Sequence, residues 1–251
     1  MNELVIIKLG GSIVTKKSED GVVDSAKITL LAEQIAPFAG KFPLIIVHGA
    51  GSCGHPEAKA YDIPGGVTKA NAAGIYVTHT AVSALNRSVV ASLRKAGMEA
   101  VSLHPFGCCL AENGRLVSAG VSQIKEMLAL GLIPVLHGDV VMDTKRGACI
   151  ISGDQIVPYL AVKLGAERVG IATDVGGVLA NGTVVPEINR KNVGEIDLGG
   201  SSSTDITGGM RGKINELLLL ADEGVDSHIF AANRVGDFLA GHNYGGTLVK
   251  K

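Results

Sequence analysis

Short runs of consecutive hydrophobic residues alternate along the chain with longer segments in which hydrophobic residues recur every three or four positions. The short runs have the length of β-strands, and a run such as Leu44-Ile45-Ile46-Val47 is typical of a strand buried on both faces of a parallel sheet. The strands predicted in this way cover residues 4–9, 44–48, 99–103, 133–137, 168–173, 228–231 and 247–249. The helical periodicity predicts helices over residues 25–38, 67–96, 121–129, 154–164 and 210–223.

This alternation predicts βαβ units, and therefore an α/β fold with helices on both faces of a mostly parallel sheet. Two Asn-Gly pairs lie between hydrophobic runs, where such a pair favours a tight β-hairpin turn. They are Asn113-Gly114, between residues 108–111 and 115–117, and Asn181-Gly182, between residues 178–179 and 184–185. The sequence has no internal repeat and no linker-like segment. We therefore interpret its 251 residues as one α/β domain with two lobes that flank a cleft.

Composition narrows the class of protein further. Hydrophobic residues make up 46% and charged residues 19%, which excludes an intrinsically disordered chain. The net charge is −1, and there is no Trp beside only five Phe and four Tyr. Because the chain has neither a basic field nor many aromatic side chains for base stacking, we expect no nucleic-acid partner.

The same sequence favours a protein of the cytoplasm. The start of the chain lacks the basic region of a signal peptide, and hydrophobic blocks such as residues 217–221 are far shorter than the ~20 residues needed to span a bilayer. The four cysteines, Cys53, Cys108, Cys109 and Cys149, form no CxxC motif. We expect free thiols, no membrane partner and a cytoplasmic location.

Glycine is the outlier of the composition, with 34 residues where average usage predicts about 18. The glycines cluster directly after predicted strands or before predicted helices, at residues 10–11, 49–54, 153, 176–177 and 208–209. Ligands of an open parallel sheet bind beyond the carboxyl ends of its strands, and glycine lets the backbone approach an anion closely. Several such loops at one edge predict a polyphosphate site.

Two familiar nucleotide motifs do not account for these glycines. Residues 49–54 match the dinucleotide pattern G-x-G-x-x-G, which needs a helix directly after it and a short βαβ unit. Pro56 and Pro64 are expected to break the segment that follows, so we reject a nicotinamide dinucleotide site. A Walker A loop is absent too, because Gly212-Lys213 is followed by Ile214, and Thr207 stands where the first glycine belongs.

Taken together, these segments resemble the amino acid kinase superfamily over roughly residues 4 to 250. The resemblance is carried by Lys8-Leu9-Gly10-Gly11-Ser12, the loop after the second strand, Thr173-Asp174-Val175-x-Gly177-Val178 and Asp205-x-Thr207-Gly208-Gly209-Met210-x-x-Lys213. Within that superfamily, His48-Gly49-Ala50-Gly51-Ser52-x-Gly54-His55-Pro56, Lys17 and Ser152-Gly153-Asp154 are similar to isopentenyl phosphate kinases. Cys53 departs from that family, which usually has an aromatic residue there, and this bears on the packing of the loop.

The resemblance implies a three-layer αβα sandwich with an open, mostly parallel sheet of about eight strands and added β-hairpins. It also implies an acceptor-binding lobe over about residues 1–165, an ATP-binding lobe over about 166–251, and a homodimer. The implied reaction is phosphoryl transfer from ATP to isopentenyl phosphate, which gives isopentenyl diphosphate and ADP in isoprenoid biosynthesis by the alternative mevalonate route. Mg²⁺ is implied by ATP, and no residue is named as its protein ligand.

The resemblance also assigns roles to four catalytic residues. Lys8 would reach the transferring phosphoryl group, and Lys17 would stabilise charge on its equatorial oxygens. The sequence leaves open whether Lys17 or the neighbouring Lys16 has this second role. His55 would donate a hydrogen bond to the acceptor phosphate, and Asp154 would hold Lys8 in place. The acceptor needs no general base, because the second pKa of a phosphate monoester is near ~6 and the group is already anionic at pH 7. Charge neutralisation and in-line positioning therefore dominate catalysis.

The remaining assignments concern binding. The donor phosphates and nucleoside would be held by Lys8, Gly10, Gly11, Ser12, Gly51, Asp174, Gly208 and Lys213, and the acceptor by Ala50, Gly51, His55 and Gly153. His79 and residues 75–78 lie on a predicted helix that the resemblance suggests as a wall for the isoprenoid tail, although packing in the helix core explains them equally well.

Proteins with other functions share much of this sequence pattern. A kinase of the same fold could act on a phosphonate such as fosfomycin, on a carboxylate such as N-acetylglutamate, or on UMP. His55 argues against a carboxylate acceptor but does not separate isopentenyl phosphate from fosfomycin. A protein that binds nucleotides or stores metal without catalysis is an alternative from another class, since fold does not fix function.

Overall fold

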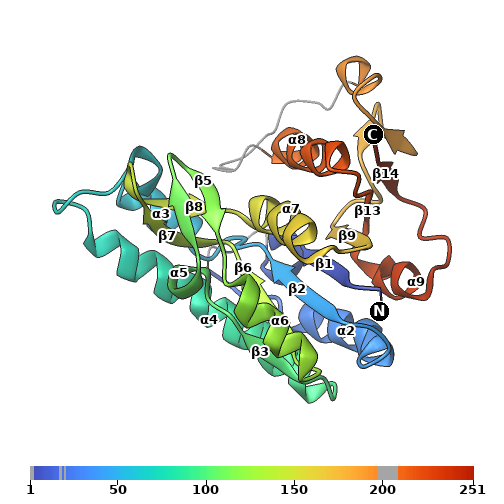
Figure 1. Cartoon of the computed structure of the whole chain (residues 1–251), viewed down its shortest axis with the longest axis horizontal. Coiled ribbons are helices and arrows are strands. Elements are labelled where there is room, and N and C mark those ends of the chain that lie inside the picture. Colours follow the sequence, from blue (N-terminus) through green and yellow to red (C-terminus); the bar gives the residue numbers. More distant parts are fainter. Residues whose placement is uncertain (1–2, 17–18, 20, 197–208) are drawn as a thin grey trace.

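The centre of the molecule is a twisted sheet that brings distant parts of the chain side by side (Figure 1). The computed structural model describes residues 3–16, 19, 21–196 and 209–251. Within these residues the sheet has eight strands, in the order β12-β14-β13-β9-β1-β2-β6-β3. The strands are β1 (Val5–Leu9), β2 (Leu44–His48), β3 (Ala100–Ser102), β6 (Ile133–His137), β9 (Arg168–Thr173), β12 (Glu187–Ile188), β13 (Ser227–Ala231) and β14 (Thr247–Val249). Six of them are parallel, while β12 and β14 run the other way.

Helices cover both faces of this sheet because its central strands are hydrophobic on both sides. Ile6 and Ile45 belong to one core, beneath the helices α6 (Val121–Ala129), α7 (Gly153–Leu164) and α8 (Gly209–Asp222). Val5 and Ile7 belong to a second core on the opposite face, beneath α2 (Ser25–Ile35), α4 (Ala73–Lys95) and α9 (Val235–Ala240). The predicted three-layer αβα sandwich and its mostly parallel sheet are confirmed.

Both predicted hairpins are present. β4 (Leu110–Glu112) and β5 (Arg115–Ser118) are joined at Asn113, and β10 (Leu179–Ala180) and β11 (Thr183–Val184) at Asn181; both asparagines have φ 50, as the tight turn requires. The first hairpin begins two residues later than predicted, because Cys108 ends the short helix α5 (Pro105–Cys108). It continues, within the described residues, into a four-stranded sheet with two strands that the sequence pattern did not predict, β7 (Asp139–Asp143) and β8 (Gly147–Ile151).

One expectation about the chain after β2 was wrong. The helix α3 (His55–Ala60) begins directly after Gly54, although Pro56 was expected to break it. Proline is tolerated there because the first turn of a helix has no internal acceptor for its N–H groups. The dinucleotide hypothesis still fails, because the next sheet strand, β3, pairs with β6 and not with β2. The predicted helix over residues 67–96 begins only at Ala73.

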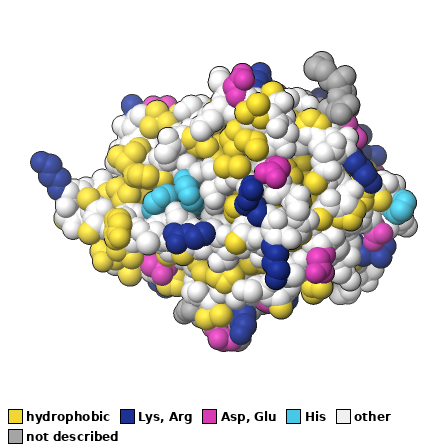
Figure 2. All heavy atoms as spheres, turned by 90° about the horizontal axis from the view of Figure 1, so that it is seen from below, with side chains coloured by type: hydrophobic (Ala, Val, Ile, Leu, Met, Phe, Trp, Pro, Cys, Tyr) yellow, Lys and Arg dark blue, Asp and Glu magenta, His cyan; other side chains and the backbone are white. Residues whose placement is uncertain are grey.

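Five short helical turns complete the fold: α1 (Gly11–Val14), η1 (Ala36–Phe38), η2 (Ile63–Gly65), η3 (Val193–Glu195) and η4 (Ala232–Arg234). In the part of the chain that the structure describes, none of the helices combines the length and the hydrophobicity needed to cross a membrane. Figure 2 shows acidic and basic side chains interspersed over the face that it displays, with no large area of one sign.

Candidate active site

A cavity of about 800 Å³ opens at the carboxyl ends of β1, β2, β6 and β9. It brings together eleven of the residues that the sequence analysis assigned to the site: Lys8, Gly10, Gly11, Ser12, Ala50, Gly51, His55, Gly153, Asp154, Asp174 and Lys213. The other two, Lys17 and Gly208, lie outside the described residues. The predicted convergence of glycines at one edge of the sheet is therefore confirmed for residues 10–11, 49–54, 153 and 209. It is wrong for Gly176 and Gly177, which do not line the cavity; Gly177 packs against Thr247 instead.

Two glycine loops pack backbone against backbone to form one wall of the cavity. A Cβ atom on Gly11 would lie 2.5 Å from the amide nitrogen of Gly51, and one on Gly49 would lie 2.6 Å from the amide nitrogen of Gly11. Both positions therefore exclude any larger residue. Thr15 fastens the loops, because its hydroxyl donates to the carbonyl of Gly11 and accepts the amide of Ser52, each at 3.0 Å. The motifs did not reveal this role of Thr15.

Asp154 joins two lysines that are far apart in the sequence. It lies in the first turn of α7, and its Oδ1 lies 2.9 Å from Nζ of Lys8 on β1 and 3.1 Å from Nζ of Lys213 on α8. All three side chains are largely buried: Lys8 is 4% exposed, Asp154 14% and Lys213 13%. Gly153 leaves room for this contact, since a Cβ there would lie 2.9 Å from Cε of Lys8. The contact of Asp154 with Lys8 was predicted, whereas its contact with Lys213 was not.

Burial and pairing act in opposite directions on these groups. Burial lowers the pKa of Lys8 to about 8, although the nearby Asp154 carboxylate opposes this shift. Burial alone would raise the pKa of Asp154, but Lys8 and Lys213 more than offset it and bring that pKa to about 2. At pH 7 Asp154 is therefore ionised and Lys8 is mostly protonated. Two cations around one anion leave a local positive charge for a polyphosphate to neutralise.

His55 faces the same cavity from the first residue of α3. The helix start is fixed by Gly54, whose φ of +96 favours glycine and whose amide donates to Oε2 of Glu57 at 2.8 Å. A Cβ on Gly54 would also lie 2.5 Å from Val82 on α4. Cys53, the departure from the family pattern, is buried in the core beneath α2 and α4, where burial raises the pKa of its thiol. It therefore acts as a small core side chain.

Across the cavity from α3, Asp174 follows the end of β9. Its carboxylate accepts a hydrogen bond from the hydroxyl of Ser12 at 3.1 Å, so the loops after β1 and β9 meet here. The hydroxyl of Thr173 donates to the carbonyl of Val175 at 2.8 Å and so shapes the turn that presents Asp174.

The cavity also contains residues that the motifs did not assign. Lys16 lies in its wall, where its ammonium is 3.1 Å from Glu19, and it is one of the two lysines between which the sequence analysis left the choice open. Lys59 comes from α3, Thr78 and Val82 come from α4, Asp139 begins β7, and Met210 lies on α8. His79, expected on a wall of the acceptor chamber, does not line the cavity, and of residues 75–78 only Thr78 does. Nδ1 of His79 instead contacts the Asp139 carboxylate at 3.0 Å.

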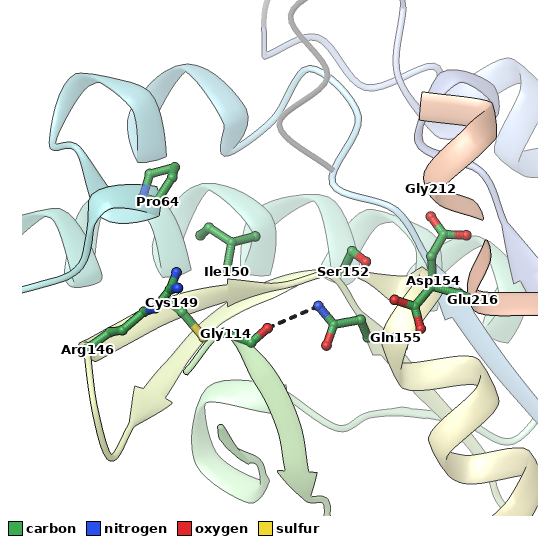
Figure 3. A pocket seen from close by; sticks show the side chains of 10 residues that line it. All are labelled: Pro64, Gly114, Arg146, Cys149, Ile150, Ser152, Asp154, Gln155, Gly212 and Glu216. Carbon is green, nitrogen blue, oxygen red and sulfur yellow. Dashed lines mark hydrogen bonds between the residues drawn. The ribbon is translucent and has the colours of Figure 1, made fainter. Parts of the chain in front are cut away.

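A smaller cavity of about 250 Å³ adjoins the main one and shares Ile150, Ser152 and Asp154 with it. In Figure 3, Arg146 and Asp154 lie at opposite ends of this cavity, and Gln155 donates a hydrogen bond to the carbonyl of Gly114 between them. Arg115 on β5 and Glu216 on α8 form an ion pair, and Glu216 lines the cavity. The hairpin and the α8 helix are thereby linked beside the site.

Known proteins are similar to this chain in architecture and in sequence. The model of the amino acid kinase family matches residues 3–231. An isopentenyl phosphate kinase of Haloferax volcanii is 40% identical, with 96% of this chain and 97% of the relative covered. Another, of Methanothermobacter thermautotrophicus, is 39% identical with 98% of each covered. A crystal structure of an isopentenyl phosphate kinase superposes with a TM-score of 0.87 at 34% identity, covering 98% of this chain and all of that one. The chain therefore belongs to the amino acid kinase family, and it is similar over nearly its whole length to isopentenyl phosphate kinases.

Proposed function

We propose that this protein transfers the γ-phosphoryl group of ATP to the phosphate of isopentenyl phosphate, giving isopentenyl diphosphate and ADP. The observation that carries the proposal is the shared cavity of His55, the Lys8–Asp154–Lys213 cluster and the two packed glycine loops. In this cavity Lys8 and Lys213 supply cations for a polyphosphate, and His55 supplies a hydrogen-bond donor for a second phosphate. The near full-length similarity to isopentenyl phosphate kinases supports the identity of the acceptor.

In the proposed reaction, an acceptor phosphate oxygen forms a bond to the γ-phosphorus. The bond to the β–γ bridging oxygen breaks, and its electron pair leaves with ADP. Lys8 would neutralise charge on the transferring group, while Asp154 keeps Lys8 and Lys213 at a fixed separation. His55 and the amides of Ala50, Gly51 and Gly153 would hold the acceptor in line. No step needs a base, because the acceptor is already anionic.

The donor would lie against the residues that follow β1. We propose that the amides of Gly10, Gly11 and Ser12 hold the phosphates of ATP, with Asp174 beside the nucleoside. Lys17 and Gly208 keep the roles that the family resemblance assigns, as proposals. Lys16 is the described alternative to Lys17, since it lies in the wall of the cavity.

Mg²⁺ is proposed to enter with ATP. It prefers carboxylate and phosphate oxygens. Among the residues that the structure describes, no three His, Cys, Asp or Glu side chains converge in a metal site, and the Asp154 carboxylate already pairs with Lys8 and Lys213. The donor set therefore fits an ion held mainly by the phosphates of ATP, where it would neutralise part of their charge.

The test of the proposed function is ADP release from Mg-ATP with several acceptors in parallel. We expect kcat/KM of about 10⁴ M⁻¹s⁻¹ or more with isopentenyl phosphate, within the normal range of enzymes, and far lower values with fosfomycin, N-acetylglutamate and UMP. If another acceptor is used best, the isoprenoid assignment fails while the kinase assignment holds. ATP binding without ADP formation from any acceptor would instead support a non-catalytic nucleotide-binding protein.

Activity should also depend on pH through Lys8. We expect kcat/KM for ATP to fall as the pH rises through about 8, because the pKa of Lys8 is lowered to about 8 and only its protonated form stabilises phosphate charge. The measurement is a pH profile between pH 6 and pH 10. In Lys8→Arg the decline should disappear, because a guanidinium stays protonated over this range. A wild-type profile that is flat up to pH 10 would contradict the prediction.

Three further predictions accompany the proposed function. The acceptor lobe over about residues 1–165 and the ATP lobe over about 166–251 are proposed as functional halves of one domain. A homodimer and a cytoplasmic location are proposed from the family resemblance. Light scattering of the purified protein measures the molar mass in solution and so tests the homodimer directly.

A further inference from the structure

Two neighbouring strands end in the same dipeptide. β2 ends in His48 and is followed by Gly49, and β6 ends in His137 and is followed by Gly138. The two histidines are paired in register across the sheet, and their rings stack with centroids 5.4 Å apart at 21°. Both are fully buried, and neither lines the cavity, whereas both glycines do. The pair of His-Gly sequences therefore lies directly behind the wall of the proposed acceptor site.

Hydrogen bonds fix the proton on one nitrogen of His48. Its Nδ1 lies 2.9 Å from the carbonyl oxygen of Gly49, which can only accept, so Nδ1 carries the proton. Its Nε2 lies 3.0 Å from Nδ2 of Asn86. That amide group also donates to the carbonyl of Val135 at 3.3 Å and is therefore the NH₂ side of Asn86. His48 is thus a neutral imidazole that donates through Nδ1 and accepts through Nε2.

His137 repeats this arrangement with different partners. Its Nδ1 lies 3.0 Å from the carbonyl of Gly138, and its Nε2 lies 2.8 Å from Nδ1 of His104. Burial lowers the pKa of His48 to about 4 and that of His137 to about 3, so both are uncharged at pH 7. The titratable groups that face them are His104, whose own pKa burial lowers, and Asp139. Asp139 is held by His79 and by the amides of Phe106 and Val140. A neutral imidazole contributes no charge to anion binding, so any effect must come from its direction.

The direction matters because a peptide group has two ends. In a planar trans peptide the C=O of one residue points opposite to the N–H of the next. Glycine offers little resistance to turning such a peptide over. If the Gly49–Ala50 peptide turned over, a carbonyl oxygen would replace the Ala50 amide at the cavity. Gly138 lies beside the same amides, because a Cβ on it would lie 3.7 Å from the Gly153 nitrogen and 3.8 Å from the Ala50 nitrogen. Turning over the peptide after Gly138 would likewise bring a carbonyl oxygen to this wall.

We propose that His48 and His137 are positioning residues for the acceptor phosphate. Their Nδ1–H groups hold the carbonyls of Gly49 and Gly138 toward the interior, so that neither of these two carbonyl oxygens faces the anion. The proposal rests on the proposed function for the identity of the acceptor, but the arrangement of the wall applies to any phosphate bound there. A carbonyl dipole turned toward a phosphate would be repelled by it, and a donor would be lost at the same time.

The kinetic test compares two substitutions that each keep half of the imidazole. The side-chain nitrogen of Asn can replace Nδ1, whereas that of Gln replaces Nε2. We expect His48→Gln and His137→Gln to lower kcat/KM for isopentenyl phosphate by about ten- to a hundredfold, with KM for ATP changed less than about twofold. His48→Asn and His137→Asn should recover most of this loss. His228→Gln, which replaces a histidine of β13 that hydrogen-bonds Tyr244, is the matched control for stability.

The outcomes separate positioning from simple packing. If Asn and Gln variants lose activity equally and in proportion to their thermal destabilisation, the histidines are only structural and the proposal is wrong. A parallel rise in KM for ATP and for the acceptor would overturn it as well.

A second measurement does not depend on the acceptor. Long-range ¹H–¹⁵N spectra of the wild-type protein should show His48 and His137 as neutral Nδ1–H tautomers at pH 7, and inorganic phosphate should shift the amide signals of Ala50 and Gly153. An Nε2–H tautomer or an imidazolium at either position would overturn the proposal. If these signals are as expected but isopentenyl phosphate is not phosphorylated, the proposed function fails and the positioning role stands.

Discussion

Lys8→Met is expected to reduce kcat by about a hundred- to a thousandfold while the protein remains folded. The methionine fills most of the space of the lysine stem beside Gly153, so the loss should come from the missing charge and not from a cavity. Asp154 keeps Lys213 as a partner at 3.1 Å, so its carboxylate is not left unpaired by the substitution. The transferring phosphoryl group, in contrast, would lose the cation that we propose Lys8 supplies.

The measurement combines steady-state ADP release with thermal unfolding. Lys27→Met is the matched control, because Lys27 also forms an ion pair, with Asp24 at 3.1 Å, but lies on α2 away from the cavity. It should retain nearly full activity. If Lys8→Met is largely unfolded at the assay temperature, or if its kcat stays within about threefold of the wild type, the catalytic role of Lys8 is wrong.

His55→Ala is expected to lower kcat/KM for isopentenyl phosphate by about a hundredfold and to leave KM for ATP nearly unchanged. His55 lies at the start of α3, whereas Ser12, Asp174 and Lys213 line the same cavity from α1, from the residues after β9 and from α8. Its side chain would supply a hydrogen bond to the acceptor. The helix itself should survive, because Gly54 and Glu57 continue to fix its first turn.

A graded series of substitutions sharpens this test. His55→Gln keeps a donor and should recover part of the activity, and His242→Ala replaces an exposed histidine as the control. Steady-state kinetics with each substrate varied in turn measures both constants. An equal loss of affinity for ATP would place His55 on the donor side and would contradict its assignment.

The sequence predicted the parts of the fold that local pattern controls. The strands of residues 44–48 and 133–137 are hydrophobic at nearly every position, and the structure has them with these bounds. The hairpins at Asn113 and Asn181 were predicted because few residue pairs suit such turns. β7 was missed because it begins and ends with an aspartate, a residue that strands disfavour. Asp143 is stable there because its carboxylate accepts four backbone amides, which no local pattern reveals.

The same limit applies to the site. The motifs predicted that Lys8 and Asp154 would meet, since both belong to the family pattern, but they did not predict that one carboxylate serves two lysines. Lys213 reaches Asp154 only because α7 and α8 pack side by side. The neutral histidines escaped notice for a related reason. His48 and His137 are 89 residues apart, and only the register of β2 against β6 stacks their rings.

The position of β1 at the middle of the sheet sets the order in which the chain can fold. β1 pairs with β2 on one side and with β9 on the other, where Val5 is in register with Arg168. During synthesis the N-terminal strand must therefore wait, with one hydrogen-bonding edge unpaired, until β9 has left the ribosome. We expect ribosome-bound chains that end before residue 168 to be cleaved readily by protease in β1, and chains that extend well beyond residue 173 to be protected. Lys8, which we propose contacts the transferring phosphoryl group, therefore lies on a strand whose pairing is completed late in synthesis.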